Sequence, residues 1–138
     1  MDFIYERKIN YYETDRMGIV HHSNYIRFLE EARCDFLEKL NIPYSSFEEH
    51  GISIPVLGVN CSYKHHVTFN DTILIKVYIK KYNGVKLTMG YDVSEKLTGS
   101  TVIIAETEHC FTTNNLKPVN LKKYAPDYDN VFKSIFTN

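Results

Sequence analysis

The sequence predicts an α+β domain in which an antiparallel, five-stranded sheet wraps around one long central helix. Two observations carry this prediction. Residues 24–40 place apolar side chains around much of a helical circumference, which is typical of a helix buried in the middle of a domain. Residues 54–113 alternate apolar and polar side chains in runs separated by turns, which is typical of antiparallel strands. Because helix and strands are segregated along the chain, a sheet packed on a helix is favoured over a parallel α/β fold.

Size, charge and cysteine usage restrict the class of protein. The 138 residues fit one domain, expected at 1–138, and the net charge of -1 argues against a nucleic-acid-binding protein. No apolar run reaches the roughly 18 residues that span a bilayer, and the opening residues mix charged with apolar side chains, unlike a signal peptide. We therefore expect no membrane insertion. Three widely spaced cysteines predict a reduced, cytoplasmic protein without a disulfide framework.

The first half of the chain carries the helical signals. Residues 3–12 predict a strand. Ser23 and Asn24 offer side-chain oxygens that would cap the long helix at its start, and residues 41–43 (Asn-Ile-Pro) would end it. The run Ser-Ser-Phe-Glu at residues 45–48 fits a capping box, which predicts a short second helix.

The second half is expected to supply most of the sheet. Four further strands are predicted, in meander-like succession, at residues 54–63, 73–80, 87–93 and 101–113. Asn83-Gly84 is a strong signal for a two-residue hairpin turn, and residues 127–136 have the apolar spacing of a terminal helix that docks on the domain. Five strands around one helix would leave a sheet edge and an apolar face uncovered, so we expect a homodimer or homotetramer.

The segment from Tyr11 to Tyr25 carries the chemistry. It places the Asp15 carboxylate on a turn just before the start of the long helix. Backbone N–H groups at a helix N-terminus have no partner within the helix, and they can hold the oxyanion that develops on a thioester carbonyl. A nearby carboxylate can attack that carbonyl or activate a water molecule. This chemistry requires no metal and no cofactor.

The same segment reads Tyr-x-x-x-Asp-x-x-Gly-x-Val-His-His-x-x-Tyr. It resembles the hotdog-fold thioesterases of the 4-hydroxybenzoyl-CoA thioesterase family, and more nearly the acyl-CoA thioesterases associated with the Tol-Pal system. The resemblance extends over nearly the whole chain. It implies the hotdog fold and the hydrolysis of an acyl-CoA to a carboxylic acid and free coenzyme A. An acyl carrier protein as the carrier stays open.

The resemblance also implies roles for individual residues. Asp15 matches the catalytic carboxylate, as nucleophile or general base. His22 occupies the helix-entry position whose backbone N–H is the expected oxyanion donor, and Tyr11 matches a tyrosine that supports the acid. Substrate-binding residues are expected at His21, Tyr25 and Lys86, the last as part of a thin basic cluster facing the coenzyme A phosphates.

Two other functional classes compete with the hydrolase. A non-catalytic module that binds acyl thioesters has no use for a carboxylate beside the thioester. A hydratase of the same fold usually pairs its Asp with a His through an Asn-Pro turn, which does not follow Asp15. If Asp15 were not the acid, Glu13 and Glu30 would be the alternatives.

Several further residues have simpler structural interpretations. The histidine pairs at residues 21–22 and 65–66 suggest a metal, but adjacent side chains on a strand point to opposite faces, so we predict no metal site. Glu30 and Arg33, three apart on the predicted helix, are expected to form an ion pair. Cys34 is expected to pack rather than to act as a nucleophile.

Overall fold

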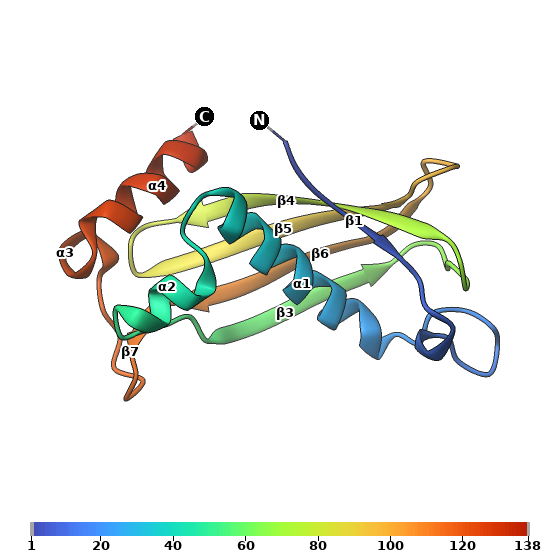
Figure 1. Ribbon diagram of the computed structural model, residues 1–138, viewed down its shortest axis with the longest axis horizontal. Coiled ribbons are helices and arrows are strands. Elements are labelled where there is room, and N and C mark those ends of the chain that lie inside the picture. The colour runs from blue at the N-terminus through green and yellow to red at the C-terminus, as the bar shows by residue number, and fades with distance from the viewer. Residues whose placement is uncertain (1, 138) are drawn as a thin grey trace.

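In a computed structural model, which describes residues 2–137, one long helix lies across one face of an antiparallel sheet (Figure 1). The helix is α1 (Ser23–Lys39). The sheet has the strand order β1-β4-β5-β6-β3. Its strands are β1 (Phe3–Lys8), β3 (Val56–Tyr63), β4 (Thr72–Tyr82), β5 (Lys86–Glu95) and β6 (Thr101–Cys110). The predicted α+β fold, with a five-stranded sheet around a central helix, is confirmed.

Short elements complete the chain. The 3-10 helix η1 (Tyr11–Glu13) follows β1. Helix α2 (Tyr44–Glu49) follows α1. The remaining elements are the paired two-residue strands β2 (Ile52–Ser53) and β7 (Thr112–Thr113) and the C-terminal helices α3 (Leu121–Tyr124) and α4 (Pro126–Thr137). Within residues 2–137, no helix is long and apolar enough to cross a membrane.

The core lies between α1 and the sheet. Alternate side chains of β4 and β5 face the helix and are at most 8% exposed: Ile73, Ile75, Val77, Ile79, Leu87, Met89, Tyr91 and Val93. From α1, Phe28, Leu29 and Phe36 are at most 1% exposed. Burying one such side chain contributes about 1.5–3 kcal/mol. The period-two pattern of the strands therefore predicted correctly which face meets the helix.

The position of β3 differs from the predicted meander. β3 pairs with β6 at one edge of the sheet, in a register that sets Cys61 opposite Ala105, and not with β4. Tight turns join β4 to β5 and β5 to β6, so these strands pair in sequence order. The link from β3 to β4 covers residues 64–71 without a hairpin, so β4 pairs instead with β1.

The predicted boundaries around the start of α1 were partly wrong. The first strand ends at Lys8 rather than at residue 12, because Asn10 turns the chain into η1 by donating its N–H to Glu13 Oε1 (2.8 Å). Ser23 and Asn24 do not cap α1. Their side chains are used locally: Ser23 Oγ hydrogen-bonds His21 Nδ1 (2.8 Å), and the Asn24 amide donates to the Glu13 carbonyl (2.9 Å).

The second helix is present, but the capping box predicted at residues 45–48 is not. Helix α2 begins at Tyr44, and the Ser46 hydroxyl donates to the Pro43 carbonyl (2.7 Å). Pro43 occupies the N-cap position with a φ of -59°, and its side chain has no oxygen that could cap the helix. The helix ends before Gly51, whose φ of +69° favours glycine.

The β4–β5 hairpin and the terminal helix were predicted correctly in kind. The hairpin loop has three residues (83–85) instead of two, because Asn83 Oδ1 accepts the N–H groups of Val85 (2.9 Å) and Lys86 (2.8 Å). Helix α4 docks as expected. Its Phe132 is fully buried and lies 6.2 Å, between ring centroids, from Phe47 of α2.

Strand β3 forms an uncovered apolar edge. Val56, Leu57, Val59 and Tyr63 are each between 43% and 53% exposed. An edge strand offers unpaired backbone N–H and C=O groups to another chain, and apolar side chains strengthen such pairing. The predicted homodimer or homotetramer stays a prediction.

Candidate functional site

Backbone hydrogen bonds shape the loop that carries Asp15. Its N–H donates to the Ile19 carbonyl (2.7 Å), and its carbonyl accepts the N–H of Gly18 (3.0 Å). Its Oδ1 accepts the Met17 N–H (2.8 Å), which fixes the side chain over the turn. The second carboxylate oxygen makes no hydrogen bond with any residue from 2 to 137 and stays available to a ligand.

At the start of α1, the backbone N–H of His22 is the donor that remains available. Ser23 N–H donates to His21 Nδ1 (3.3 Å), Asn24 N–H to the His21 carbonyl (2.9 Å) and Tyr25 N–H to the His22 carbonyl (3.2 Å). The His22 N–H has no acceptor within the described chain. A free N–H at a helix N-terminus, where the helix dipole is positive, suits a developing negative charge.

Asp15, His22 and Tyr25 line one surface cleft of about 340 Å³. The structure therefore brings together three of the predicted site residues. Tyr25 is only 4% exposed, and burial, with Tyr63 as a smaller cause, raises the pKa of its hydroxyl to about 12. At neutral pH the phenol is protonated, so Tyr25 is a wall and a hydrogen-bond donor rather than a base.

The opposite wall of the cleft comes from a distant segment that the sequence did not assign to the site. It consists of Tyr63, Lys64, His65 and His66, at and just after the end of β3. The Val20 N–H donates to the Val67 carbonyl (3.0 Å), which holds this segment against the Asp15 loop. No local pattern relates residues 63–66 to Asp15. Only the sheet topology does.

The histidine pairs do not lie as expected. Neither pair belongs to a strand, and within each pair the rings stack, at 4.4 Å between the centroids of His21 and His22 and 4.8 Å between those of His65 and His66. The expectation that they point to opposite faces was therefore wrong. Over residues 2–137, no three His, Cys, Asp or Glu side chains are grouped to hold a metal ion.

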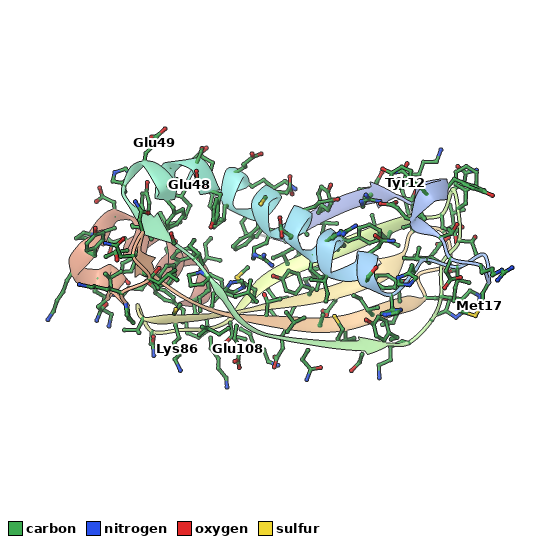
Figure 2. The ribbon with its side chains drawn as sticks, turned by 90° about the horizontal axis from the view of Figure 1, so that it is seen from below. Tyr12, Met17, Glu48, Glu49, Lys86 and Glu108 are labelled. Atoms are coloured by element: carbon green, nitrogen blue, oxygen red, sulfur yellow. The ribbon has the colours of Figure 1, made fainter. Side chains whose placement is uncertain are left out.

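Three predicted residues lie outside this cleft. Tyr11 is 74% exposed, and its ring packs edge-on against Phe69, with 5.6 Å between centroids. His21 is exposed and is held by Ser23. Lys86 lies toward the α2 end of the sheet, far from Met17 of the Asp15 loop (Figure 2). Their roles stay predictions.

An ion cluster around the buried Glu13 carboxylate supports the Asp15 loop. The Arg7 guanidinium donates to both carboxylate oxygens of Glu13 (2.5 Å each) and to Glu31 Oε1 (2.7 Å). Burial alone would raise the pKa of Glu13, but the hydrogen bonds from Arg7 and from the Asn10 N–H hold it below its ordinary value. The Glu13 carboxylate is thus ionised and already bound on both oxygens by Arg7, so Glu13 is no longer a candidate for the catalytic acid.

The cluster acts on the loop through the Glu13 backbone. The Glu13 carbonyl accepts both the His21 N–H (2.9 Å) and the Asn24 amide (2.9 Å). The chain therefore enters and leaves the Asp15 loop at one fixed point. Arg7 also lies 4.0 Å from the ring centroid of Phe28, which ties the cluster to the core of α1.

We expect Arg7→Met to destabilise the protein by about 3–5 kcal/mol, the cost of leaving a buried charge without its partner. Glu13 is only 4% exposed and would lose both of its carboxylate contacts with Arg7. Urea unfolding measures the effect. Lys96→Met is the matched control, because its ion pair with Glu6 is exposed on both sides and should contribute at most about 1 kcal/mol. A cost for Arg7→Met no larger than that of the control would contradict the cluster's role.

Known proteins give the site its context. A protein of Aquifex aeolicus, named provisionally as an esterase, is 37% identical over 123 residues, covering 89% of this chain and 94% of that protein. YneP of Bacillus subtilis, named provisionally as an acyl-CoA thioesterase, is 33% identical over 129 residues, covering 93% of each chain. The crystal structure of DHNA-CoA thioesterase from Staphylococcus aureus superposes with a TM-score of 0.94 at 28% identity, covering 99% of this chain and 91% of that one.

These similarities confirm the hotdog fold and the predicted class of enzyme, a thioester hydrolase. A family model described as the Thioesterase-like superfamily matches residues 9–126, a span that includes the Asp15 loop, the whole of α1 and all strands of the five-stranded sheet except β1. The chain belongs to this Thioesterase-like superfamily.

Proposed function

We propose that the chain hydrolyses acyl-CoA to a carboxylic acid and free coenzyme A, without metal or cofactor, as one domain over residues 1–138. One observation carries the proposal: the unpaired oxygen of Asp15 and the free N–H of His22 belong to residues that line the same cleft at the start of α1. A carboxylate and an oxyanion donor are the two groups that acyl transfer from a thioester needs.

Two routes use these groups. In the first, Asp15 attacks the thioester carbonyl carbon, the C–S bond breaks to release the coenzyme A thiolate, and water then hydrolyses the acyl-aspartyl anhydride. In the second, Asp15 takes a proton from water as the water attacks the carbonyl carbon. The C–S bond then breaks, and Asp15 passes that proton to the departing sulfur, so that coenzyme A leaves as the thiol. In both routes the His22 N–H donates to the oxyanion.

The uncovered edge of β3 supports a dimer with a shared site. If two copies of β3 pair antiparallel with their Val59 residues opposite each other, the Val56 end of one strand lies opposite the Tyr63 end of the other. Tyr63 lines the Asp15 cleft. Lys86 lies near the Val56 end, because Lys86 and Leu87 pair with Cys110 and His109, and His109 pairs with Val56. The dimer would thus bring Lys86 of one subunit toward the Asp15 cleft of the other, where coenzyme A phosphates would bind.

We expect the purified protein to release free thiol from at least one member of a panel of short, long and aromatic acyl-CoAs, at the same rate with and without a chelator. The assay follows the thiol colorimetrically, and the same acyl groups on acyl carrier protein test the alternative carrier. Inactivity on the whole panel, or inactivation by the chelator, would contradict the proposal. Tight binding without turnover would favour the non-catalytic binding module. The cytoplasmic location and the nearer resemblance to Tol-Pal-associated enzymes stay predictions.

A further inference from the structure

A second cavity, of about 350 Å³, lies between the C-terminal half of α1 and the sheet. It shares no lining residue with the Asp15 cleft. Most of its wall is apolar, with Leu37 from α1 and Leu87 and Met89 from β5. Its volume is within the range of small-ligand sites, and it would hold a small acyl group.

A file of buried polar groups leads from the cavity wall, where His109 and Arg33 line the cavity, into the core. Tyr91, Thr107 and His109 are each at most 2% exposed on the inner face of β5 and β6. The Tyr91 hydroxyl lies 2.7 Å from Thr107 Oγ1, which lies 2.7 Å from His109 Nε2. Arg33 on α1 donates from Nη1 to the Tyr91 hydroxyl (3.2 Å). Buried polar groups cost stability unless they are hydrogen-bonded. Both hydroxyls of the file are hydrogen-bonded, whereas His109 Nδ1 has no partner within the described residues.

The arginine meets the file only as a donor. A guanidinium only donates, so the Tyr91 hydroxyl accepts from Arg33, and in the Tyr91–Thr107 and Thr107–His109 contacts either atom can be the donor. Burial, followed by the positive charge of Arg33, lowers the pKa of His109 to about 4. His109 is therefore neutral near pH 7. The whole file is neutral, and Arg33 is the only cation that lines the cavity within residues 2–137.

Arg33 lacks an acidic partner within the described part of the chain. The predicted ion pair with Glu30 does not form: its one side-chain hydrogen bond goes to the neutral Tyr91 hydroxyl. The side chain is half-buried, and a guanidinium in that position normally pairs with a carboxylate or another strong acceptor. Glu30, an exposed residue of α1, also lines the cavity but forms no ion pair with Arg33.

We propose that this cavity receives the acyl group of the substrate and that Arg33 binds an acceptor oxygen on that group. The preferred substrates would then be thioesters of carboxy- or hydroxy-acyl groups rather than of plain hydrocarbon acids. This inference rests on the proposed hydrolysis and on the pairing of two β3 edges. Val56 lines the cavity and Tyr63 the Asp15 cleft, so that pairing sets the cavity of one subunit beside the cleft of the other.

Three thioesters of equal chain length test it: butyryl-, 3-hydroxybutyryl- and succinyl-CoA, with spontaneous hydrolysis subtracted. We expect kcat/KM for at least one oxygen-bearing substrate to exceed that for butyryl-CoA by roughly 10- to 100-fold, the range for a hydrogen bond to a charged group. Arg33→Met should abolish this ratio. Arg33→Lys keeps the positive charge but loses the planar guanidinium. If this variant still prefers succinyl-CoA, the group that residue 33 binds on the substrate is a carboxylate. If it loses the preference, that group is a hydroxyl.

Arg27→Met, an exposed arginine on the same helix, is the matched control and should keep both the rates and the ratio. The inference is wrong if butyryl-CoA is hydrolysed as well as the other two, or if Arg33→Met lowers all three rates by the same factor. If the wild-type protein hydrolyses none of the three, the proposed hydrolysis fails for these substrates. The proposed role of the cavity is then tested by calorimetric binding of the same three thioesters. Equal affinities would overturn this role, and tighter binding of an oxygen-bearing thioester would support it.

Discussion

Asp15→Asn is expected to lower kcat for acyl-CoA hydrolysis at least ~100-fold, the lower range for loss of a positioned base, while leaving the fold nearly unchanged. Asparagine keeps the size and one acceptor oxygen, so the hydrogen bond from the Met17 N–H should survive. It loses the negative charge and the basicity that both nucleophilic attack and water activation require. Steady-state kinetics on the best acyl-CoA of the panel, with a thermal melt for the fold, measures both effects.

The control for this variant is His22→Ala. Because the substitution keeps the backbone N–H, activity should fall less than in Asp15→Asn if that N–H is the main oxyanion donor. Near wild-type activity in Asp15→Asn would overturn the assignment of the acid. Glu30 would then be the remaining candidate, because Arg7 already holds both carboxylate oxygens of Glu13.

Val59→Asp is expected to convert the protein to a monomer at micromolar concentration and to reduce activity by about 100-fold. Val59 is 43% exposed on the edge strand β3, so a carboxylate there costs a lone subunit little. At the centre of a β3–β3 seam, however, two such charges would face each other in an apolar contact. Activity should fall with the dimer, since displacing a substrate-positioning element by even 1 Å can cost about 100-fold. Light scattering and the thiol assay measure the two effects.

Leu97→Asp provides the matched comparison for this variant. Leu97 is 89% exposed in the turn between β5 and β6, so the same change of charge is made away from the β3 edge. It should leave both the mass and the activity unchanged. A stable wild-type monomer, or a fully active monomeric Val59→Asp protein, would rule out a site shared between subunits.

Local patterns in the sequence predicted the parts of the fold that depend on local physics. The alternation in β4 and β5 and the docked α4 follow from which side chains avoid water, and both were confirmed. Helix α1 buries one face rather than much of its circumference, since the apolar side chain of Ile26 is 47% exposed. The helix caps were not predicted correctly. Ser23 and Asn24 have good capping side chains, but the Asp15 loop uses those side chains to hold His21 and Glu13.

The candidate site divides in the same way. Asp15, His22 and Tyr25 lie within eleven residues of one another, and a turn followed by a helix was enough to bring them together. The wall at residues 63–66 depends on which edge of the sheet β3 joins, and no local pattern specifies that pairing. The file of Tyr91, Thr107 and His109 depends on the register of β5 against β6, which no local pattern specifies either.

In the Asp15 loop, the main chain fixes the position of the Asp15 carboxylate, while the neighbouring side chains set its surroundings. Main-chain hydrogen bonds and Gly18, whose φ of +83° favours glycine, set the course of the loop, and Arg16 and Met17 point outward as exposed side chains. Met17 also lines the cleft. Substitution of the Met17 side chain can therefore change the size and polarity of the cleft wall without moving the Asp15 carboxylate. The loop thus lets the surroundings of the thioester vary while the proposed acid keeps its position.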